Sequence, residues 1–238
     1  MTEPPGAAST TADYDRHYAA GGFGYEERRE HWLAWARRHY VEDFGLAPGR
    51  LLDVGCGDGF WTSVFTELGF EAIGVDRSPG GIEAALSKYP GIPFLVVDAD
   101  EPLPFAEGSF DVIFCRAISH FGEPNLEAAH VTTLIARLME LLAPDGVLLA
   151  SYNTKRDGSS VHGRTYHPVS ALLRLLEGGG DPFRVEVVGN YVQIGVVHRG
   201  RPGRSAAGRS TAASTPSAGL PRRIVRAVRR SLGVVGRR

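Results

Sequence analysis

Apolar segments alternate with helical stretches along this chain, and that alternation restricts its fold more than any other feature. Five short apolar runs carry the pattern, at residues 51–54, 72–75, 94–97, 112–114 and 147–150. Strands separated by helices in this way are typical of a parallel sheet with helices on both faces. Two later β-rich runs are joined by the two-residue turn Gly189-Asn190, which predicts an antiparallel hairpin. We therefore expect a doubly wound α/β fold with a mostly parallel seven-stranded sheet and a C-terminal hairpin.

The composition divides the 238 residues into four parts. Residues 1–13 are rich in Pro, Ala, Ser and Thr and are expected to be a disordered leader. Residues 14–198 hold the predicted domain, 199–221 have the composition of a flexible linker, and 222–238 form a basic tail. Within the domain, aromatic and apolar residues at helical spacing over 25–44 predict an amphipathic helix that leads into the first strand.

Residues with cap preferences set the bounds of the later helices. Ser78 followed by Pro79 is typical of a helix start, and this helix is expected to run towards Tyr89. The longest helix is expected over 126–142, and another over 168–176.

Charge and cysteine content exclude several classes of protein. Eleven arginines and no acidic residue lie in 199–238, so the other 198 residues hold 15 basic and 27 acidic residues, a net charge of −12. Cys56 and Cys115 are too few for a disulfide framework or a Cys-rich metal site. No apolar run approaches the roughly 18 residues that span a bilayer. We therefore expect a cytoplasmic location.

A glycine-rich loop follows the first predicted strand. Residues 51–61, Leu-Leu-Asp-Val-Gly-Cys-Gly-Asp-Gly-Phe-Trp, read as a strand, a loop and the start of a helix. Gly55, Gly57 and Gly59 remove the Cβ atoms that would stop a ligand from lying against the backbone. The second strand ends at Asp76, 21 positions after Gly55, the spacing at which a carboxylate accepts hydrogen bonds from a ribose diol. The pattern predicts a ribose-containing ligand, although each glycine could also serve only a tight turn.

The glycine spacing separates two classes of ligand. NAD sites usually read G-x-G-x-x-G and hold pyrophosphate at the helix N-terminus. Here the pattern is G-x-G-x-G, and Asp58 stands where pyrophosphate would meet the backbone. An acidic loop favours a cationic ligand without phosphate. S-adenosylmethionine, with its sulfonium, ammonium and ribose, is such a ligand.

At these residues the sequence resembles the class I S-adenosylmethionine-dependent methyltransferases, and specifically the small-molecule, methyltransferase type 11-like group. That group's first motif reads Asp-x-Gly-x-Gly-x-Gly, and residues 97–105 are similar to its Asp-Ala-x-x-Leu-Pro-Phe block with one extra residue. The resemblance covers 51–146 and implies S-adenosylmethionine as the cofactor. The cofactor-binding residues that it implies are Asp53, Gly55, Gly57, Asp76, Asp98, Ala99 and Arg116.

The resemblance also implies a part of the cofactor for most of these residues. Asp76 would bind the ribose hydroxyls, Asp98 the adenine amino group, and Arg116 would lie near the methionine end. Asp98 forms an acidic cluster with Asp100 and Glu101, in which any one side chain could instead be a solvated loop carboxylate.

Methyl transfer to a hydroxyl group needs a base that removes the acceptor's proton. His120 is our first candidate, because it follows the fourth predicted strand at a position that faces the acceptor cavity in related folds. Packing beside Phe121 is the alternative role for His120. Further candidates follow the fifth strand: Tyr152, Asn153, His162, Tyr166 and His167. We expect no metal, since an Asp-Asn pair of the catechol type is absent near the fifth strand.

An aromatic segment precedes the amphipathic helix. Tyr14, Tyr18, Phe23 and Tyr25 either line the acceptor pocket as part of a lid or pack on the edge of the sheet. Glycines between them would let such a lid hinge.

These observations predict a methyltransferase that O-methylates a small molecule or a sugar-containing (glycan) acceptor, which could be linked to a lipid. Two alternatives stay open: a nucleic-acid methyltransferase that uses the Arg-rich tail, and a non-catalytic S-adenosylmethionine-binding regulator. We expect no nucleic-acid partner. On a helical wheel the apolar residues of 224–235 separate from the arginines, which favours peripheral contact with an anionic membrane. Docking on an acidic protein surface, or no role, are the alternatives for the tail.

Overall fold

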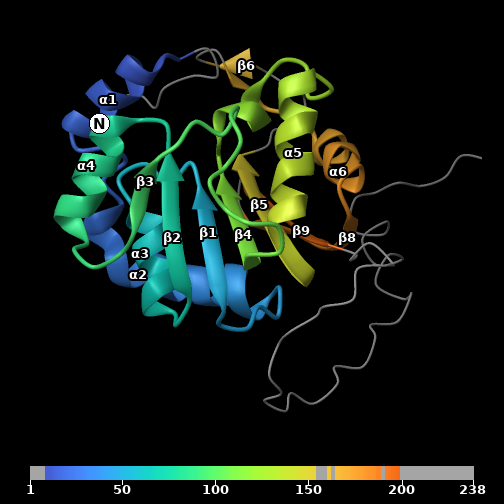
Figure 1. Ribbon diagram of the computed structural model, residues 1–238, viewed down its shortest axis with the longest axis horizontal. Coiled ribbons are helices and arrows are strands. Elements are labelled where there is room, and N and C mark those ends of the chain that lie inside the picture. Colours follow the sequence, from blue (N-terminus) through green and yellow to red (C-terminus); the bar gives the residue numbers. More distant parts are fainter. Residues whose placement is uncertain (1–8, 154–159, 162–163, 189–190, 199–238) are drawn as a thin grey trace, which may run out of the picture.

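The computed structural model describes residues 9–153, 160–161, 164–188 and 191–198. Seven strands form one sheet in the order β3-β2-β1-β4-β5-β9-β8 (Figure 1). Their bounds are β1 Arg50–Val54, β2 Glu71–Asp76, β3 Phe94–Val96, β4 Phe110–Arg116, β5 Leu142–Asn153, β8 Asp181–Val188 and β9 Tyr191–Val197. Within this sheet β9 runs antiparallel to both of its neighbours, and the other neighbouring strands are parallel. The predicted α/β fold with an antiparallel C-terminal hairpin is confirmed.

Helices cover both faces of the sheet (Figure 1). Their bounds are α1 Thr11–Ala19, α2 Arg29–Ala36, α3 Phe60–Glu67, α4 Pro79–Lys88, α5 Ala129–Leu141 and α6 Val169–Glu177. Successive residues of a strand point to opposite faces. Leu51 of β1 therefore joins a buried cluster with Phe65 of α3, whereas Leu52 joins a cluster with Leu134 of α5. Burial on both faces accounts for the apolar run in β1.

Side-chain contacts fix the start of α4 and attach α1 to it. Ser78 Oγ accepts a hydrogen bond from the Gly81 amide at 2.9 Å, as expected for the cap of this helix. The Asp15 carboxylate of α1 accepts hydrogen bonds from Ser78 Oγ at 2.5 Å and from the Gly80 amide at 2.9 Å. The helix α1 is thereby held against the N-terminal end of α4.

Helical order begins closer to the N-terminus than the composition indicated. Thr10 and Asp13 form a capping box, in which the Asp13 amide donates to Thr10 Oγ1 at 3.3 Å and the Thr10 amide donates to Asp13 Oδ2 at 2.7 Å. As a result α1 begins at Thr11, within the residues that we assigned to the leader. Residues 1–8 lie outside the described ranges.

The predicted helix over 25–44 is divided into three segments. A 3-10 turn over Tyr25–Arg28 precedes α2, and a π-helical segment over Arg37–Glu42 follows it. Tyr40 in this last segment is fully buried, and its hydroxyl lies 3.0 Å from Ser151 Oγ of β5. The segment therefore joins the helical layer to the centre of the sheet.

The predicted helix over 126–142 is shorter than expected at both ends. It starts only after Ala128, which has an extended backbone. At the other end Leu142 already belongs to β5, where it pairs with Phe110 of β4. Pairing with the neighbouring strand has replaced the last helical residue, which propensity alone does not reveal.

Several sequence predictions concern residues that the structure does not describe. The linker 199–221, the basic tail 222–238 and the turn Gly189-Asn190 lie outside the described residues. Val188 and Tyr191, on either side of that turn, are paired in the antiparallel ladder of β8 and β9. Among the helices of the described ranges, none is long and apolar enough to cross a membrane.

Candidate active site

A cavity of about 390 Å³ opens at the carboxyl ends of β1, β2 and β4. Its size is within the range of small-molecule sites, and its position is the one where open α/β sheets bind ligands. All eight site residues predicted from the sequence line it: Asp53, Gly55, Gly57, Asp76, Asp98, Ala99, Arg116 and His120. Residues that are far apart in the sequence therefore meet around one space.

The glycine loop after β1 has a backbone that only glycine adopts readily. Gly55 and Gly57 have φ angles of 75° and 57°. A Cβ atom on Gly57 would lie 2.3 Å from the hydroxyl oxygen of Tyr18 on α1. Asp58 also lines the cavity, and its carboxylate is paired with Lys88 of α4 at 2.7 Å. The Tyr18 side chain thus packs closely against the loop at Gly57.

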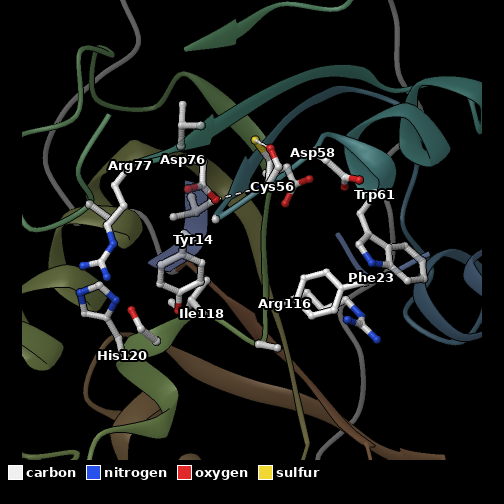
Figure 2. A pocket seen from close by; sticks show the side chains of 18 of the residues that line it. Tyr14, Phe23, Cys56, Asp58, Trp61, Asp76, Arg77, Arg116, Ile118 and His120 are labelled. Carbon is white, nitrogen blue, oxygen red and sulfur yellow. Dashed lines mark hydrogen bonds between the residues drawn. The ribbon is translucent and has the colours of Figure 1, made fainter. Parts of the chain in front are cut away.

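Asp76 at the end of β2 is oriented by two backbone amides. Its Oδ2 accepts a hydrogen bond from the Gly57 amide at 2.8 Å, drawn in Figure 2, and its Oδ1 accepts one from the Ser78 amide at 2.9 Å. Burial raises the pKa of Asp76 above its ordinary value, and these two hydrogen bonds oppose the increase. Because an ionised carboxylate accepts about four hydrogen bonds, both oxygens keep acceptor sites for a diol.

Asp53 of β1 is buried beneath the loop. Its Oδ2 accepts a hydrogen bond from Thr62 Oγ1 of α3 at 2.7 Å. The pKa of Asp53 is raised to about 7, mainly by burial and to a smaller extent by the nearby charge of Asp76, while the Thr62 hydrogen bond opposes the increase. Asp53 therefore ties the strand to the helix on either side of the loop, and it can change protonation near neutral pH.

Arg116, the last residue of β4, lies among three aromatic rings. Its guanidinium carbon is 4.7 Å from the ring centre of Tyr191, 4.8 Å from that of Trp61 and 5.3 Å from that of Tyr25. Its Nη1 donates a hydrogen bond to the Tyr25 hydroxyl at 2.9 Å. Arg116 makes no salt bridge with any described residue. The cation is held by aromatic faces and hydroxyl groups.

Two buried donors beside this cation lack partners. Within the described ranges, Nε of Arg116 and Nε1 of Trp61 are buried and make no hydrogen bond. Buried donors usually have partners, and a buried cation usually has an anion beside it. In Figure 2 both side chains lie on one side of the cavity. This side is therefore suited to an anionic group of a ligand.

His120 lies on the opposite side of the cavity, near Arg77 (Figure 2). It belongs to a short 3-10 turn over Ser119–Gly122 that follows β4. Its Nε2 is 2.9 Å from Oδ1 of Asp100, a carboxylate that the sequence placed in an acidic cluster without a defined role. The structure thus gives this histidine both a place on the cavity wall and a carboxylate partner.

The walls of the cavity are rich in tyrosine. Tyr14, Tyr18, Phe23 and Tyr25 of the N-terminal segment all line it. Residues of β5, β9 and the segment that begins with β7 (Arg164–Thr165) also line it: Tyr152, Asn153, Arg164, Tyr166 and Tyr191. These residues give the cavity a largely aromatic wall.

One of the alternative bases, His167, does not line the cavity, and another, His162, lies outside the described residues. Nε2 of His167 lies 2.6 Å from the backbone oxygen of Glu123. Tyr152 does line the cavity, but its hydroxyl donates to the backbone oxygen of Thr165 at 2.8 Å. Of the candidate histidines, His120 is the one that the described structure places at the cavity.

Ala117 carries backbone strain where β4 enters the cavity wall. Its φ angle is 52°, a left-handed conformation that is uncommon for alanine. Its amide donates to the Ser151 carbonyl at 2.8 Å, and its carbonyl accepts from Nη1 of Arg164 at 2.9 Å. Arg164 belongs to β7 (Arg164–Thr165), which pairs with β6 (Ser160–Val161). The strained turn therefore links β4 to the segment above the cavity.

Comparison with known proteins agrees with this geometry. A family model described as a methyltransferase domain matches residues 51–146. The chain is 36% identical over 104 residues to a trans-aconitate 2-methyltransferase of Acidovorax sp. (strain JS42), and the aligned residues cover 43% of this chain and 37% of that protein. It is 32% identical over 116 residues to a demethylmenaquinone methyltransferase of Renibacterium salmoninarum, and the aligned residues cover 48% of this chain and 46% of that protein. The chain spans less than half the length of the curated relatives it matches.

Solved structures with low sequence identity share the fold. A methyltransferase from Haloferax volcanii, described as putative and solved with a methyltransferase activator, matches with a TM-score of 0.65 at 16% identity and covers 82% of this chain and 100% of that one. The 1,6-didemethyltoxoflavin-N1-methyltransferase of Burkholderia thailandensis matches with a TM-score of 0.56 at 20% identity and covers 84% and 94%. With the strand order, these findings show that residues 51–146 match a methyltransferase domain and that the described residues have the fold of the class I S-adenosylmethionine-dependent methyltransferases.

Proposed function

We propose that this chain transfers a methyl group from S-adenosylmethionine to a hydroxyl oxygen of a small molecule. When bound, S-adenosylmethionine supplies the methyl group on a sulfonium, a good leaving group. The observation that carries the proposal is the single cavity in which the glycine loop, Asp76 and His120 meet. Two relatives with the matched domain are named for methyl transfer to small molecules, which supports an acceptor of that class.

The residues around the loop fit the adenosine part of this cofactor. Asp76 has acceptor sites left for two ribose hydroxyls, since its two amide partners occupy only part of its capacity. Asp98 and Ala99 line the same cavity after β3 and would lie beside the adenine. Gly55 lines the same cavity with a left-handed backbone that glycine adopts readily.

Calorimetry tests the choice of cofactor. We expect the protein to bind S-adenosylmethionine and S-adenosylhomocysteine and not NAD, because the loop carries Asp58 where pyrophosphate would meet the backbone. Tighter binding of NAD than of either adenosyl ligand would overturn the proposed function.

Arg116 fits the carboxylate of the cofactor's methionine part. Its charge and the unpartnered donors of Arg116 and Trp61 are what such an anion requires. We expect Arg116→Met to weaken S-adenosylhomocysteine binding by roughly 10- to 100-fold, the cost of about 1.5–3 kcal/mol for a lost charged hydrogen bond. Binding of 5′-methylthioadenosine, which lacks the amino acid part, should stay unchanged.

Measuring both ligands on Arg116→Met by calorimetry distinguishes the loss of one contact from a general disturbance of the site. Arg37→Met, at an exposed position of the π-helical segment, is the matched control and should change neither affinity. Equal losses for S-adenosylhomocysteine and 5′-methylthioadenosine would mean that Arg116 only supports the aromatic cage.

The acceptor is identified by a transfer assay with methyl-labelled S-adenosylmethionine. The panel contains phenols, hydroxy acids, carboxylic acids, hydroxyl-bearing glycans and RNA. We expect label on a hydroxyl group of a small molecule. Label on RNA alone would favour the nucleic-acid methyltransferase, and binding of cofactor without any product would favour the regulator. We further propose that the acceptor is a glycan or is linked to a lipid. We also propose that residues 222–238 contact an anionic membrane.

A further inference from the structure

The hydrogen bond between His120 and Asp100 uses one ring nitrogen and leaves the other available. Nε2 of His120 lies 2.9 Å from Oδ1 of Asp100. The His120 side chain is 10% exposed and Asp100 is 45% exposed, so the carboxylate approaches from the solvent side. Among the described contacts of His120, Nδ1 has no hydrogen-bond partner. His120 lines the cavity, whereas Asp100 does not.

Two contacts hold Asp100 in place behind the histidine. Its amide donates to Oδ1 of Asp98 at 3.0 Å. Its carbonyl accepts a hydrogen bond from Nη1 of Arg137 on α5. The loop that carries Asp100 is thus fixed both to a residue of the cofactor site and to a helix of the core.

This arrangement selects one tautomer of the imidazole. An ionised carboxylate only accepts hydrogen bonds, so Nε2 must carry the proton. In the neutral ring Nδ1 then carries the lone pair. That is the form in which a histidine removes a proton from a hydroxyl group.

The charges around the pair keep Asp100 ionised. Partial burial raises the pKa of Asp100, but the hydrogen bond and charge of His120, together with His130 and Arg77, bring it below its ordinary value. His130 of α5 has its ring centre 5.8 Å from that of His120, and its Nε2 lies 3.9 Å from a carboxylate oxygen of Glu123. Asp100 is the carboxylate in direct contact with His120.

We propose that Asp100 is a positioning residue, which holds His120 with its Nδ1 lone pair available to the methyl acceptor. The proposal rests on the proposed function. In the transfer, the acceptor hydroxyl passes its proton to Nδ1 while its oxygen forms the bond to the methyl carbon, and the electron pair of the broken sulfur–carbon bond stays on sulfur. Asp100 remains ionised and stabilises the resulting imidazolium through Nε2.

Nuclear magnetic resonance tests the tautomer without any acceptor. Long-range ¹H–¹⁵N spectra of the protein saturated with S-adenosylhomocysteine report which ring nitrogen is protonated, and His120→Gln assigns the signals. We expect the Nε2–H tautomer in the wild type and in Glu101→Gln, the matched control on the same loop. Asp100→Ala should give a mixture of tautomers. An Nδ1–H tautomer in the wild type, or the same spectrum in Asp100→Ala, would overturn the proposal.

Kinetics with the best hydroxyl substrate of the panel supply the second readout. We expect Asp100→Ala and Asp100→Asn to lower kcat about tenfold or more while KM for S-adenosylmethionine stays within twofold. Asn keeps an oxygen near Nε2 but removes the charge. A purely structural role of Asp100 would not lower kcat while leaving KM unchanged.

The two readouts fail in different ways. If Asp100→Asn has the kcat of Glu101→Gln, Asp100 does not act through His120. If the wild type binds the cofactor and methylates no hydroxyl group, the proposed function is wrong, and the tautomer measurement still decides the geometry of the pair.

Discussion

Replacing His120 by alanine is expected to lower kcat by about 10² to 10⁴, the usual contribution of a general base. The reason is that His120 is the histidine that the described structure places at the cavity, with a carboxylate partner on its far nitrogen. Affinity for S-adenosylhomocysteine should stay near that of the wild type. Transfer kinetics with a hydroxyl acceptor measure kcat, and calorimetry measures the affinity for S-adenosylhomocysteine.

An exposed histidine gives the control for this variant. His31→Ala, at the outer face of α2 next to Trp32, should leave both kcat and cofactor affinity unchanged. If kcat of His120→Ala is within a few-fold of the wild-type value, His120 is not the base and only packs beside Phe121. Loss of cofactor affinity equal to the loss of kcat would place His120 in the cofactor site instead.

The parts of the site that were predictable from sequence are local in the chain. The glycine loop directly follows β1 and Asp76 is the last residue of β2, and these two strands are parallel neighbours whose carboxyl ends meet at one edge. A correct reading of strand, loop and helix is then enough to bring these residues together. The same logic brings Arg116 and His120 to the cavity, since β4 lies beside β1.

The partners of these residues were not predictable in this way. Tyr191 reaches Arg116 only because β9 runs antiparallel to β5, which places Tyr191 opposite Asn153 at the carboxyl end of the sheet. Trp61 faces Arg116 from the first turn of α3. Such contacts depend on register and helix rotation between distant elements, and no spacing along the chain encodes them.

The start of α1 shows a local signal that composition concealed. Thr10 and Asp13 have the spacing of a capping box, which favours a helix start even in a segment rich in small residues. Asp15 and Tyr18 then attach this helix to α4 and to the glycine loop. Composition alone therefore misses the start of a helix, α1, that packs against the site.

The contact between Tyr18 and Gly57 leads to the second large effect. Gly57→Ala is expected to weaken S-adenosylhomocysteine binding by about tenfold or more, because its Cβ would lie 2.3 Å from the Tyr18 hydroxyl and would displace the loop against which the cofactor is proposed to lie. The ring of Tyr18 is buried, so the loop or α1 must move to relieve the contact. Calorimetry of the variant measures the loss directly.

Two further variants separate backbone strain from collision. Gly45 has a φ angle of 63° with nothing within 4 Å of its would-be Cβ, so Gly45→Ala carries the strain alone. It should lower the free energy of unfolding by about 1–2 kcal/mol and leave cofactor affinity unchanged. Adding Tyr18→Ala to Gly57→Ala removes the collision and should restore part of the lost affinity. If Gly57→Ala leaves the affinity for S-adenosylhomocysteine unchanged, as expected for Gly45→Ala, the cofactor does not lie on this loop and the proposed cofactor site is wrong.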